Sequence, residues 1–243
     1  MSTRQRLDEA LVARGLYPSR SRARDAVLRG TVKIDGERAA KPSQMVGANN
    51  VLTIEDEAQG YVSRAALKLK HGLTQFGISV RGKNALDIGA STGGFTQVLL
   101  EEGAAHVTAI DVGHGQMKVH DPRVTLVEGL NARDLSTEHL DMPIQLVVCD
   151  VSFISLKLAL PAALELAEEG AMLVALIKPQ FEAGKDAIGK GGIVTDPQVH
   201  DRVCAEIAEF LRSQGWRVLG VAPSPVEGGD GNREFLVAAG KSS

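Results

Sequence analysis

The chain has 243 residues, 44% of them apolar and 23% charged, with a net charge of −3, which suits one large domain or one large and one small domain. No apolar run reaches the roughly 18 residues of a membrane span, and no basic-then-apolar leader opens the chain. Cys149 and Cys204 are too far apart for a metal site, so we expect a reduced, cytoplasmic protein without a metal or a membrane segment.

Charge is unevenly distributed along the chain. Residues 1–41 hold ten basic and five acidic residues, a balance of +5, so the remaining residues carry −8. A basic end on an acidic body indicates a polyanionic partner that one part of the molecule holds.

The N-terminal region predicts two helices and a hairpin. Apolar spacing indicates a short helix over 6–15 that ends at Gly15, and a second over 22–28 that Ser19 or Ser21 caps and that ends near Gly30. Alternation around an Asp-Gly turn predicts a hairpin over 31–38, and residues 51–54 have the pattern of one more strand.

Arginine predominates among the basic residues of this region. A solvated arginine-rich face would explain that, but the planar guanidinium also suits phosphate, which favours nucleic-acid binding. Arg-Leu-Asp-x-x-Leu-Val-x-Arg-Gly-Leu, Ser-Arg-Ser-Arg-Ala, Gly-x-Val-x-Ile-Asp-Gly and Lys41-Pro42 resemble the S4 RNA-binding domain over roughly residues 4–56. The resemblance implies binding of structured RNA. The candidate RNA-binding residues here are Arg4, Arg6, Arg14, Arg20, Arg22, Arg24, Arg29 and Lys41.

A short linker, residues 59–62, separates the expected domains 1–58 and 63–243. A flexible chain of that length spans only about 10 Å, so we expect the two domains to be mechanically coupled. Residues 63–73 then have helical spacing, with Ser63 as the cap. Lys68 lies at the edge of the apolar face of this helix, where a surface lysine is the plainer interpretation. Arg64 is a further candidate for contact with RNA.

The stretch 84–100 begins as an apolar strand, breaks at glycines and continues with helical spacing. Such a turn brings backbone N–H groups and the positive end of a helix close to a ligand. The glycines do not follow G-x-G-x-x-G, so S-adenosylmethionine is a better candidate than a dinucleotide, and the turn alone is also consistent with an ordinary βα connection. The cofactor-binding candidates are Asp87, Gly89, Ala90, Ser91, Thr92, Gly93, Gly94, Phe95 and Thr96.

Two later residues strengthen the cofactor hypothesis. Asp111 ends a predicted strand over 105–111, where an acid can accept both ribose hydroxyls of a nucleoside cofactor. Its alternative role is to cap a helix over 113–118. Asn131, which follows a third strand over 124–127, is the candidate for a contact with adenine.

Charged residues close two further strands. Strand 144–149 is followed by Asp150 and strand 171–177 by Lys178, which Pro179 pins at the strand tip. Parallel sheets place their chemistry at strand ends, so Asp150 and Lys178 should lie together near the cofactor, and Asp150 is also a cofactor-binding candidate.

The remaining pattern completes an α/β fold. Helices over 152–166 and 197–213, strands over 216–221 and 234–238, and the earlier strands predict a Rossmann-like, seven-stranded parallel sheet with helices on both faces. Lys185 and Lys190 belong to a glycine-rich loop over 184–192. They could close on RNA phosphate, or the loop could simply be flexible.

The motifs of the larger domain resemble the FtsJ-type ribose 2′-O-methyltransferases. They are Ser63-Arg64-Ala65-x-x-Lys68-Leu69, Asp87-x-Gly89-Ala90-x-x-Gly93-Gly94-Phe95-Thr96, Asp150, Lys178-Pro179 and Asn232-Arg233-Glu234-Phe235. With the S4 domain, the whole chain resembles the TlyA family of ribosomal RNA cytidine 2′-O-methyltransferases. The resemblance implies S-adenosylmethionine as cofactor, ribosomal RNA or a ribosomal subunit as partner, and a catalytic tetrad at Lys68, Asp150, Lys178 and Glu234.

The ends of the chain resemble those of the shorter form of this family. Helix-forming sequence begins by Arg6, and five residues follow Ala238. The family links this form to 23S rRNA alone, which makes 23S rRNA the expected substrate and 16S rRNA a second candidate.

The residue types suit this reaction. A ribose 2′-hydroxyl is a poor acid, so methyl transfer benefits from a base near its proton. A free lysine has a pKa of about 10.4, and a second lysine together with partial burial can lower it towards roughly 7–8. We therefore predict that Lys178 is the base and that Lys68 lowers the pKa of Lys178 and orients the hydroxyl. Asp150 and Glu234 would hold the two lysines.

Three alternatives remain open. A non-catalytic RNA-binding or ribosome-assembly factor could share the fold, and transfer of labelled methyl to ribosomal RNA would separate the two. Some family members are labelled haemolysins, but the expected lack of a leader, long apolar segments and a strongly amphipathic cationic helix disfavours that role. The arginine-rich N-terminal region disfavours a small-molecule methyltransferase. The target nucleotide stays open, and we expect a monomer or a weak homodimer.

Overall fold

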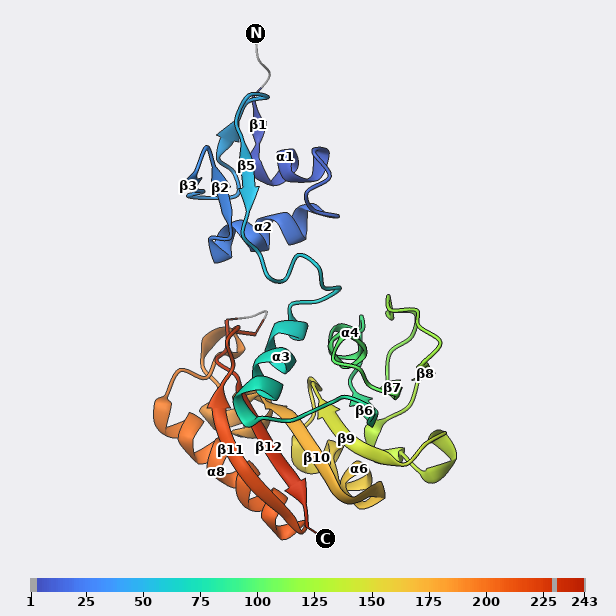
Figure 1. Ribbon diagram of the computed structural model, residues 1–243. Coiled ribbons are helices and arrows are strands. Elements are labelled where there is room, and N and C mark those ends of the chain that lie inside the picture. Colours follow the sequence, from blue (N-terminus) through green and yellow to red (C-terminus); the bar gives the residue numbers. More distant parts are fainter. Residues whose placement is uncertain (1–3, 229–230, 243) are drawn as a thin grey trace. The chain divides into compact units, whose positions relative to one another are not determined.

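The computed structural model describes residues 4–228 and 231–242, except for the side chain of Lys185. The chain divides into two compact units, Met1–Gly60 and Tyr61–Ser243. Each unit has a core of its own (Figure 1).

Two helices and five short strands form the described part of the N-terminal unit, from residue 4 onwards. The helices are α1 (Leu7–Ala13) and α2 (Arg20–Arg29), and the strands are β1 (Gln5–Arg6), β2 (Val32–Ile34), β3 (Glu37–Arg38), β4 (Met45–Val46) and β5 (Leu52–Ile54). Ser19 caps α2 by accepting the N–H of Arg22, and Gly30 ends it with a φ of 76°. Asp35 and Gly36 both have positive φ, as a tight hairpin turn between β2 and β3 requires. The predicted helices, hairpin and last strand are therefore present.

The β1–β4 pair was not predicted, because two-residue strands leave no alternation to detect. The core of this unit comes from the apolar faces of both helices and from β2 and β4. Its fully or almost fully buried residues include Leu7, Leu11, Ala23, Val27, Val32 and Val46.

A seven-stranded sheet forms the centre of the C-terminal unit, in the order β11-β12-β10-β9-β6-β7-β8. The strands are β6 (Asn84–Ile88), β7 (His106–Asp111), β8 (Val124–Glu128), β9 (Ile144–Cys149), β10 (Ala167–Ile177), β11 (Trp216–Pro223) and β12 (Phe235–Lys241). Strands β6 to β10 pair in parallel, but β12 runs antiparallel to both β10 and β11. The prediction of a wholly parallel sheet is therefore wrong at β12, because the chain returns from β11 through a loop instead of a crossover helix.

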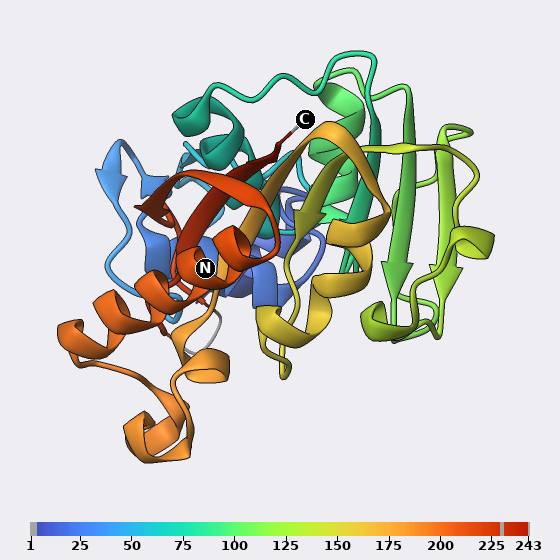
Figure 2. The same cartoon turned by 90° about the horizontal axis from the view of Figure 1, so that it is seen from below.

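Helices cover both faces of this sheet. One face carries α3 (Ala65–Phe76) and α4 (Gly94–Glu101), and the other carries α5 (Leu156–Ala159), α6 (Pro161–Leu166) and α8 (Pro197–Ser213) (Figure 2). Successive residues of β9 point to opposite cores: Leu146 and Val148 to the first, Val147 and Cys149 to the second. The short elements are α7 (Pro179–Glu182), η1 (Ala132–Asp134), η2 (Thr137–His139), η3 (Lys185–Ala187) and η4 (Lys190–Gly192).

Three predicted helices need correction. Residues 152–155 are irregular, and α5 and α6 are separate because Pro161 has no N–H to continue a helix. The helix predicted over 63–73 begins at Ala65 and continues to Phe76, where Gly77 ends it. Residues 113–118 form no helix, which removes the capping alternative for Asp111.

The described parts of the chain, 4–228 and 231–242, contain neither a helix suited to a membrane nor a metal-binding cluster. No helix there combines the length and the apolar character of a membrane span. No group of three or more His, Cys, Asp or Glu there is arranged to hold a metal ion. Cys149 and Cys204 are free thiols.

Candidate functional site

The turn between β6 and α4 packs directly against the chain that follows β9. Gly89 has a φ of +81°, and a Cβ atom at this position would lie 2.8 Å from the carbonyl oxygen of Asp150. Gly93, with a φ of +95°, caps the start of α4. Only glycine combines this left-handed conformation with such a close approach. The turn therefore brings its backbone to the same sheet edge as Asp150.

Asp87 supports this turn from inside the protein. Its side chain is fully buried, and Oδ2 accepts a hydrogen bond of 2.6 Å from Oγ1 of Thr96. Burial raises the pKa of Asp87 to about 7, although the hydrogen bond from Thr96 acts in the opposite direction. Asp87 and Thr96, both predicted to bind the cofactor, line none of the three cavities described below.

A large crevice of about 860 Å³ lies at the carboxyl ends of β6, β7 and β9. Among its lining residues are Gly89, Ser91, Asp111, Asn131, Asp150 and Phe153. Asp111 accepts the N–H of Ser91 at 2.8 Å on Oδ2 and the N–H of Gly113 at 2.7 Å on Oδ1. These bonds fix the carboxylate, and each oxygen keeps a further lone pair for a ligand. The Oδ1 atom of Asn131 accepts the N–H of Arg133 at 3.1 Å.

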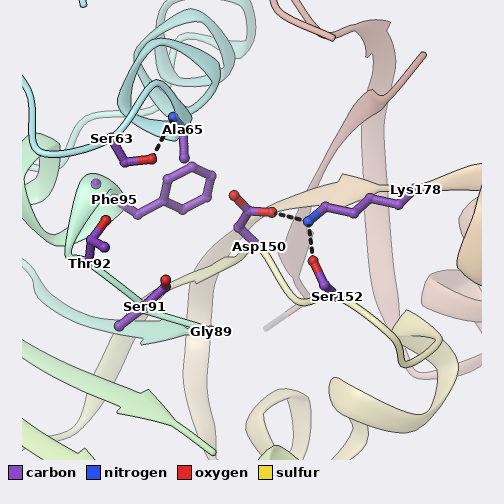
Figure 3. Close-up of a pocket in the computed structure, with 11 residues that line it drawn as sticks. Ser63, Ala65, Gly89, Ser91, Thr92, Phe95, Asp150, Ser152 and Lys178 are labelled. Atoms are coloured by element: carbon purple, nitrogen blue, oxygen red, sulfur yellow. Dashed lines mark hydrogen bonds and ion pairs between the residues drawn. The ribbon is translucent and has the colours of Figure 1, made fainter. Parts of the chain in front are cut away.

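A small cavity of about 160 Å³ adjoins the large crevice, and the two share Gly89, Ser91, Asp150 and Ser152. Its other lining residues are Ser63, Ala65, Ala90, Thr92, Gly94, Phe95 and Lys178. Figure 3 shows Asp150 between Lys178 on one side and the ring of Phe95 and the glycine turn on the other. The small cavity thus brings together most of the residues predicted at the glycine turn, though not Gly93.

A third cavity, the lysine pocket, holds about 450 Å³. It is lined by Lys68, Ser152, Phe153, Lys178, Gln180, Phe181, Ile188, Gly192 and Glu234. It shares Ser152 and Lys178 with the small cavity, and Ser152, Phe153 and Phe181 with the large crevice. The three cavities therefore meet at the carboxyl ends of β9 and β10.

Two lysine–carboxylate pairs lie at this meeting point. Nζ of Lys178 lies 2.6 Å from Oδ1 of Asp150 and donates to Oγ of Ser152 at 2.9 Å (Figure 3). Nζ of Lys68 donates to Oε2 of Glu234 at 2.5 Å, and both side chains are buried. Burying one charge without its partner would be costly, so each lysine is matched to its own carboxylate.

The four charged residues come from distant parts of the chain. Asp150 and Lys178 follow the neighbouring parallel strands β9 and β10, as the sequence predicted. Lys68 lies on α3, where a surface lysine was the plainer interpretation, and Glu234 precedes β12. The pairing of Lys68 with Glu234 buries the lysine against the sheet.

Aromatic and amide residues of the lysine pocket were not predicted. Phe153 is 91% exposed and has a φ of +66°, and its ring centroid lies 5.1 Å from that of Phe181. Gln180 is buried in the wall of the same pocket. A phenylalanine three residues after the strand-end Asp150 was the signal that the sequence offered.

The basic residues predicted to bind RNA fall into two groups. Several bond within their own unit: Arg6 and Arg20 with Asp8, Arg14 with the carbonyls of Gly47 and Asn50, Arg22 with the carbonyl of Ala58, and Arg29 with Asp25 and Asp56. Arg4, Arg24, Lys41 and Lys190 are exposed, and none has a hydrogen-bond or ion-pair partner within residues 4–228 and 231–242. Arg64 is half-buried, and the side chain of Lys185 lies outside the described part of the structure.

Family comparisons cover almost the whole chain. The FtsJ-like methyltransferase family matches residues 61–241, and the S4 domain matches residues 5–52. All four residues of the two lysine–carboxylate pairs lie inside the first match.

Similar proteins also extend over most of the chain. The 16S/23S rRNA (cytidine-2′-O)-methyltransferase TlyA of Mycobacterium tuberculosis is 46% identical over 241 residues, 98% of this chain and 90% of the relative. The 23S rRNA (cytidine-2′-O)-methyltransferase TlyA of Campylobacter jejuni is 39% identical over 180 residues, 72% of this chain and 69% of the relative. A solved structure from Streptococcus thermophilus, named as a candidate hemolysin, is 39% identical with a TM-score of 0.77, and the match covers 100% of this chain and 90% of that one.

Proposed function

This chain belongs to the FtsJ-like methyltransferase family and, within it, to the TlyA group, and from that premise we propose the reaction that it catalyses. It transfers a methyl group from S-adenosylmethionine to the 2′-hydroxyl of a cytidine in ribosomal RNA. The observation that carries this proposal is the lysine pocket beside the glycine turn, which is lined by Lys68, Lys178 and Glu234, with Asp150 paired to Lys178. The target is 23S rRNA, because the names of both TlyA relatives include it.

The residues of the large crevice fit S-adenosylmethionine. Its volume of about 860 Å³ is in the range of ligand pockets, and it lies at strand ends, where such folds bind nucleosides. Asp111 would accept the ribose hydroxyls, Asn131 would contact the adenine, and the backbone of the glycine turn would approach the amino-acid portion. When bound, this cofactor supplies an electrophilic methyl group on a sulfonium centre.

Lys178 is placed to act on the acceptor hydroxyl. It lines both the small cavity and the lysine pocket, so its Nζ faces the route between cofactor and acceptor. Asp150 and Ser152 fix the position of Nζ. In its neutral form, Lys178 would take the proton of the 2′-hydroxyl while the 2′-oxygen accepts the methyl group that the bound cofactor would supply. Alignment of the reacting atoms supplies much of the remaining rate enhancement.

Lys68 and Glu234 complete the acceptor site. Lys68 lines the lysine pocket and can donate a hydrogen bond to the 2′-oxygen, which orients the hydroxyl towards the small cavity. Glu234 balances the charge of Lys68 and holds it in place. The lysine pocket can thus contain two lysines without becoming strongly cationic.

The N-terminal unit would hold the ribosomal RNA. The exposed cations Arg4, Arg24 and Lys41 are free to contact phosphate oxygens, whereas Arg14 and Arg29 bond within the unit. Phosphate contacts position a nucleic acid without reading its sequence. We therefore assign to this unit the placement of RNA, in the cytoplasm where ribosomal RNA is made, and to the C-terminal unit the chemistry.

Methyl transfer from labelled cofactor tests this proposal. Purified protein is incubated with methyl-tritiated S-adenosylmethionine and with 23S rRNA, 16S rRNA or either ribosomal subunit from cells that lack the protein. Nuclease digestion and chromatography then identify the labelled nucleoside. We expect the label in 2′-O-methylcytidine from 23S rRNA or the large subunit. RNA that binds but gains no label would identify a non-catalytic RNA-binding factor, and label in a methylated base would contradict the ribose assignment.

A further inference from the structure

The segment 188–194 contributes two residues to the wall of the lysine pocket. Ile188 and Gly192 line the pocket together with Glu234. Apart from the short turn η4, this segment belongs to no helix and to no sheet. Something other than regular secondary structure must therefore fix the position of the wall.

The side chain of Asn232 holds this segment. Its Oδ1 atom accepts the N–H of Val194 at 2.9 Å, and its Nδ2 atom donates to the carbonyl of Gly192 at 3.0 Å. Asn232 is fully buried, and Val194 is 2% exposed. The side-chain amide therefore bonds the backbone of residues 192–194 as a neighbouring strand would. Asn232 lies two residues before Glu234, which lines the lysine pocket.

A histidine adds a third hydrogen bond to the same segment. Nε2 of His200 lies 2.9 Å from the carbonyl oxygen of Val194, so Nε2 carries the proton and donates. The ring of His200 packs against that of Phe235, with centroids 5.4 Å apart. His200 and Asn232 therefore hold the wall from α8 and from the start of β12.

The other end of the loop has its own fixed point. Glu182, at the end of α7, accepts the hydroxyl of Ser155 at 2.5 Å and the N–H of Leu156 at 2.7 Å. Between Glu182 and Gly192 the chain carries the exposed Lys190. The loop is thus fastened at both ends, and Asn232 is the fastening next to the lysine pocket.

We propose that Asn232 is a positioning residue for the methyl acceptor, because its amide joins the pocket wall at 192–194 to the chain that places Glu234. This inference rests on the proposed function. Only an amide both accepts from Val194 and donates to Gly192. A displacement of the wall or of Glu234 by about 1 Å would cost on the order of 100-fold in rate. The large crevice shares no residue with this fastening, so binding of the cofactor should be unaffected.

Asn232→Asp tests the donor half of the contact with almost no change in shape. The carboxylate can still accept from Val194, but it places an acceptor against the carbonyl of Gly192. We expect kcat/KM for RNA to fall by about 10- to 100-fold, whereas Kd for S-adenosylmethionine, measured by calorimetry, changes by less than about twofold. The matched control is Asn84→Asp. Asn84 is the first residue of β6 and lies at the end of the strand away from the cavities, so this variant should leave kcat/KM and Kd unchanged.

Limited proteolysis tests the contact of Asn232 with residues 192–194 in an experiment that does not depend on methyl transfer. Trypsin cleaves after Lys190 only when the loop opens. Asn232→Ala, which removes both bonds, should speed this cut by about 10- to 100-fold, and His200→Ala, which removes one, by about 3- to 10-fold. Cleavage sites outside residues 183–194 and 232–234 should keep their rates. If Asn232→Ala does not fold, Asn232→Asp and His200→Ala provide the same test.

The two readouts separate the possible failures. An inactive wild-type protein would contradict the proposed function, while the proteolysis could still show the fastening. An active wild type whose Asn232→Asp variant keeps both kcat/KM and trypsin resistance would overturn the positioning role. Loss of cofactor binding in Asn232→Asp would also overturn it, because the effect would then extend beyond the acceptor side.

Discussion

The two units use their charged side chains in opposite ways. In the N-terminal unit, much of the arginine content holds the unit together. Arg29 donates to both oxygens of Asp56 at 2.8 Å, and Tyr17 donates to the same carboxylate at 2.7 Å. Burial acts to raise the pKa of Asp56, but the hydrogen bonds from Arg29 and Tyr17 outweigh it and leave that pKa below its usual value. Cations that suggested an RNA surface are in part the internal framework of a small core.

In the C-terminal unit three buried charges converge on the candidate site instead. Lys68, Lys178 and Glu234 are each less than 10% exposed, and all three line one pocket. A small domain of 60 residues has little apolar surface to bury and benefits from internal ion pairs, whereas a seven-stranded sheet does not need them. The comparison shows that charge type alone does not separate framework from site. What separates them is whether a buried charged side chain also lines a cavity.

Removal of the Lys178 amine is the strongest test of this contrast. Lys178→Ala should lower turnover by about 100- to 10,000-fold, the usual contribution of a positioned base, with little change in RNA affinity. Single-turnover transfer of labelled methyl to 23S rRNA measures the effect. The matched control is Lys157→Ala, an exposed lysine whose side-chain amine pairs with Glu206, and its rate should match wild type. Normal turnover in Lys178→Ala would remove the base assignment.

The Lys68–Glu234 pair tests whether these charges serve the fold. Lys68→Met leaves a carboxylate that is 4% exposed without its partner, and this should lower the free energy of unfolding by about 3–5 kcal/mol. The double variant Lys68→Met/Glu234→Met removes both charges and should regain most of that stability without regaining turnover. Urea unfolding and the methyl-transfer assay measure the two quantities. A double variant as unstable as the single one would show that the pair is part of the framework.

The sequence predicted the parts of this site that depend on short-range order. The strand, glycine turn and helix at 84–100 each have a local sequence pattern. Asp150 and Lys178 follow strands that are consecutive and parallel, so the proximity of these two residues follows from the topology of the sheet. Lys68 meets Glu234 across 166 positions of sequence, and apolar spacing alone left it on the surface. Only the resemblance to a known family connected these two residues.

Other features depended on tertiary contacts that leave no local pattern. The direction of β12 follows from pairing between β10 and β11, and the amide of Asn232 reaches a segment 38 to 40 positions away. The internal bonds of the N-terminal arginines were missed for the same reason. The carbonyl partners of Arg14 and the Asp56 partner of Arg29 lie 27 to 36 positions away. At that separation, residue type cannot distinguish an internal acceptor from an external phosphate.

Asp87 is a buried carboxyl group that forms no ion pair within residues 4–228 and 231–242 and lines none of the three cavities. Burial raises its pKa from 3.8 to about 7, so between these pH values the folded protein keeps a proton that the unfolded chain has lost. Stability from this group is present at low pH and is lost as the pH rises through about 7. Asp87→Asn cannot ionise, so the wild type should lose on the order of 1–3 kcal/mol relative to this variant between pH 5 and pH 8. Urea unfolding at several pH values measures the difference, and parallel stability curves would contradict the raised pKa.

The smallest effect separates the two kinds of arginine within the N-terminal unit. Arg24 is exposed and has no partner in the described ranges 4–228 and 231–242, so Arg24→Ala should remove one phosphate contact, weaken binding of 23S rRNA by about 2- to 5-fold and reduce its salt dependence. The melting temperature of Arg24→Ala should not change.

Arg29→Ala should instead lower the melting temperature, because Asp56 would keep a buried charge without its guanidinium partner. Filter binding at several salt concentrations and thermal unfolding of both variants measure these effects, with Arg212→Ala, on the exposed face of α8, as the control for a general loss of positive charge. If Arg29→Ala weakened RNA binding with no loss of stability, the framework role of this arginine would be wrong, and the N-terminal unit would use its charges as the C-terminal unit does.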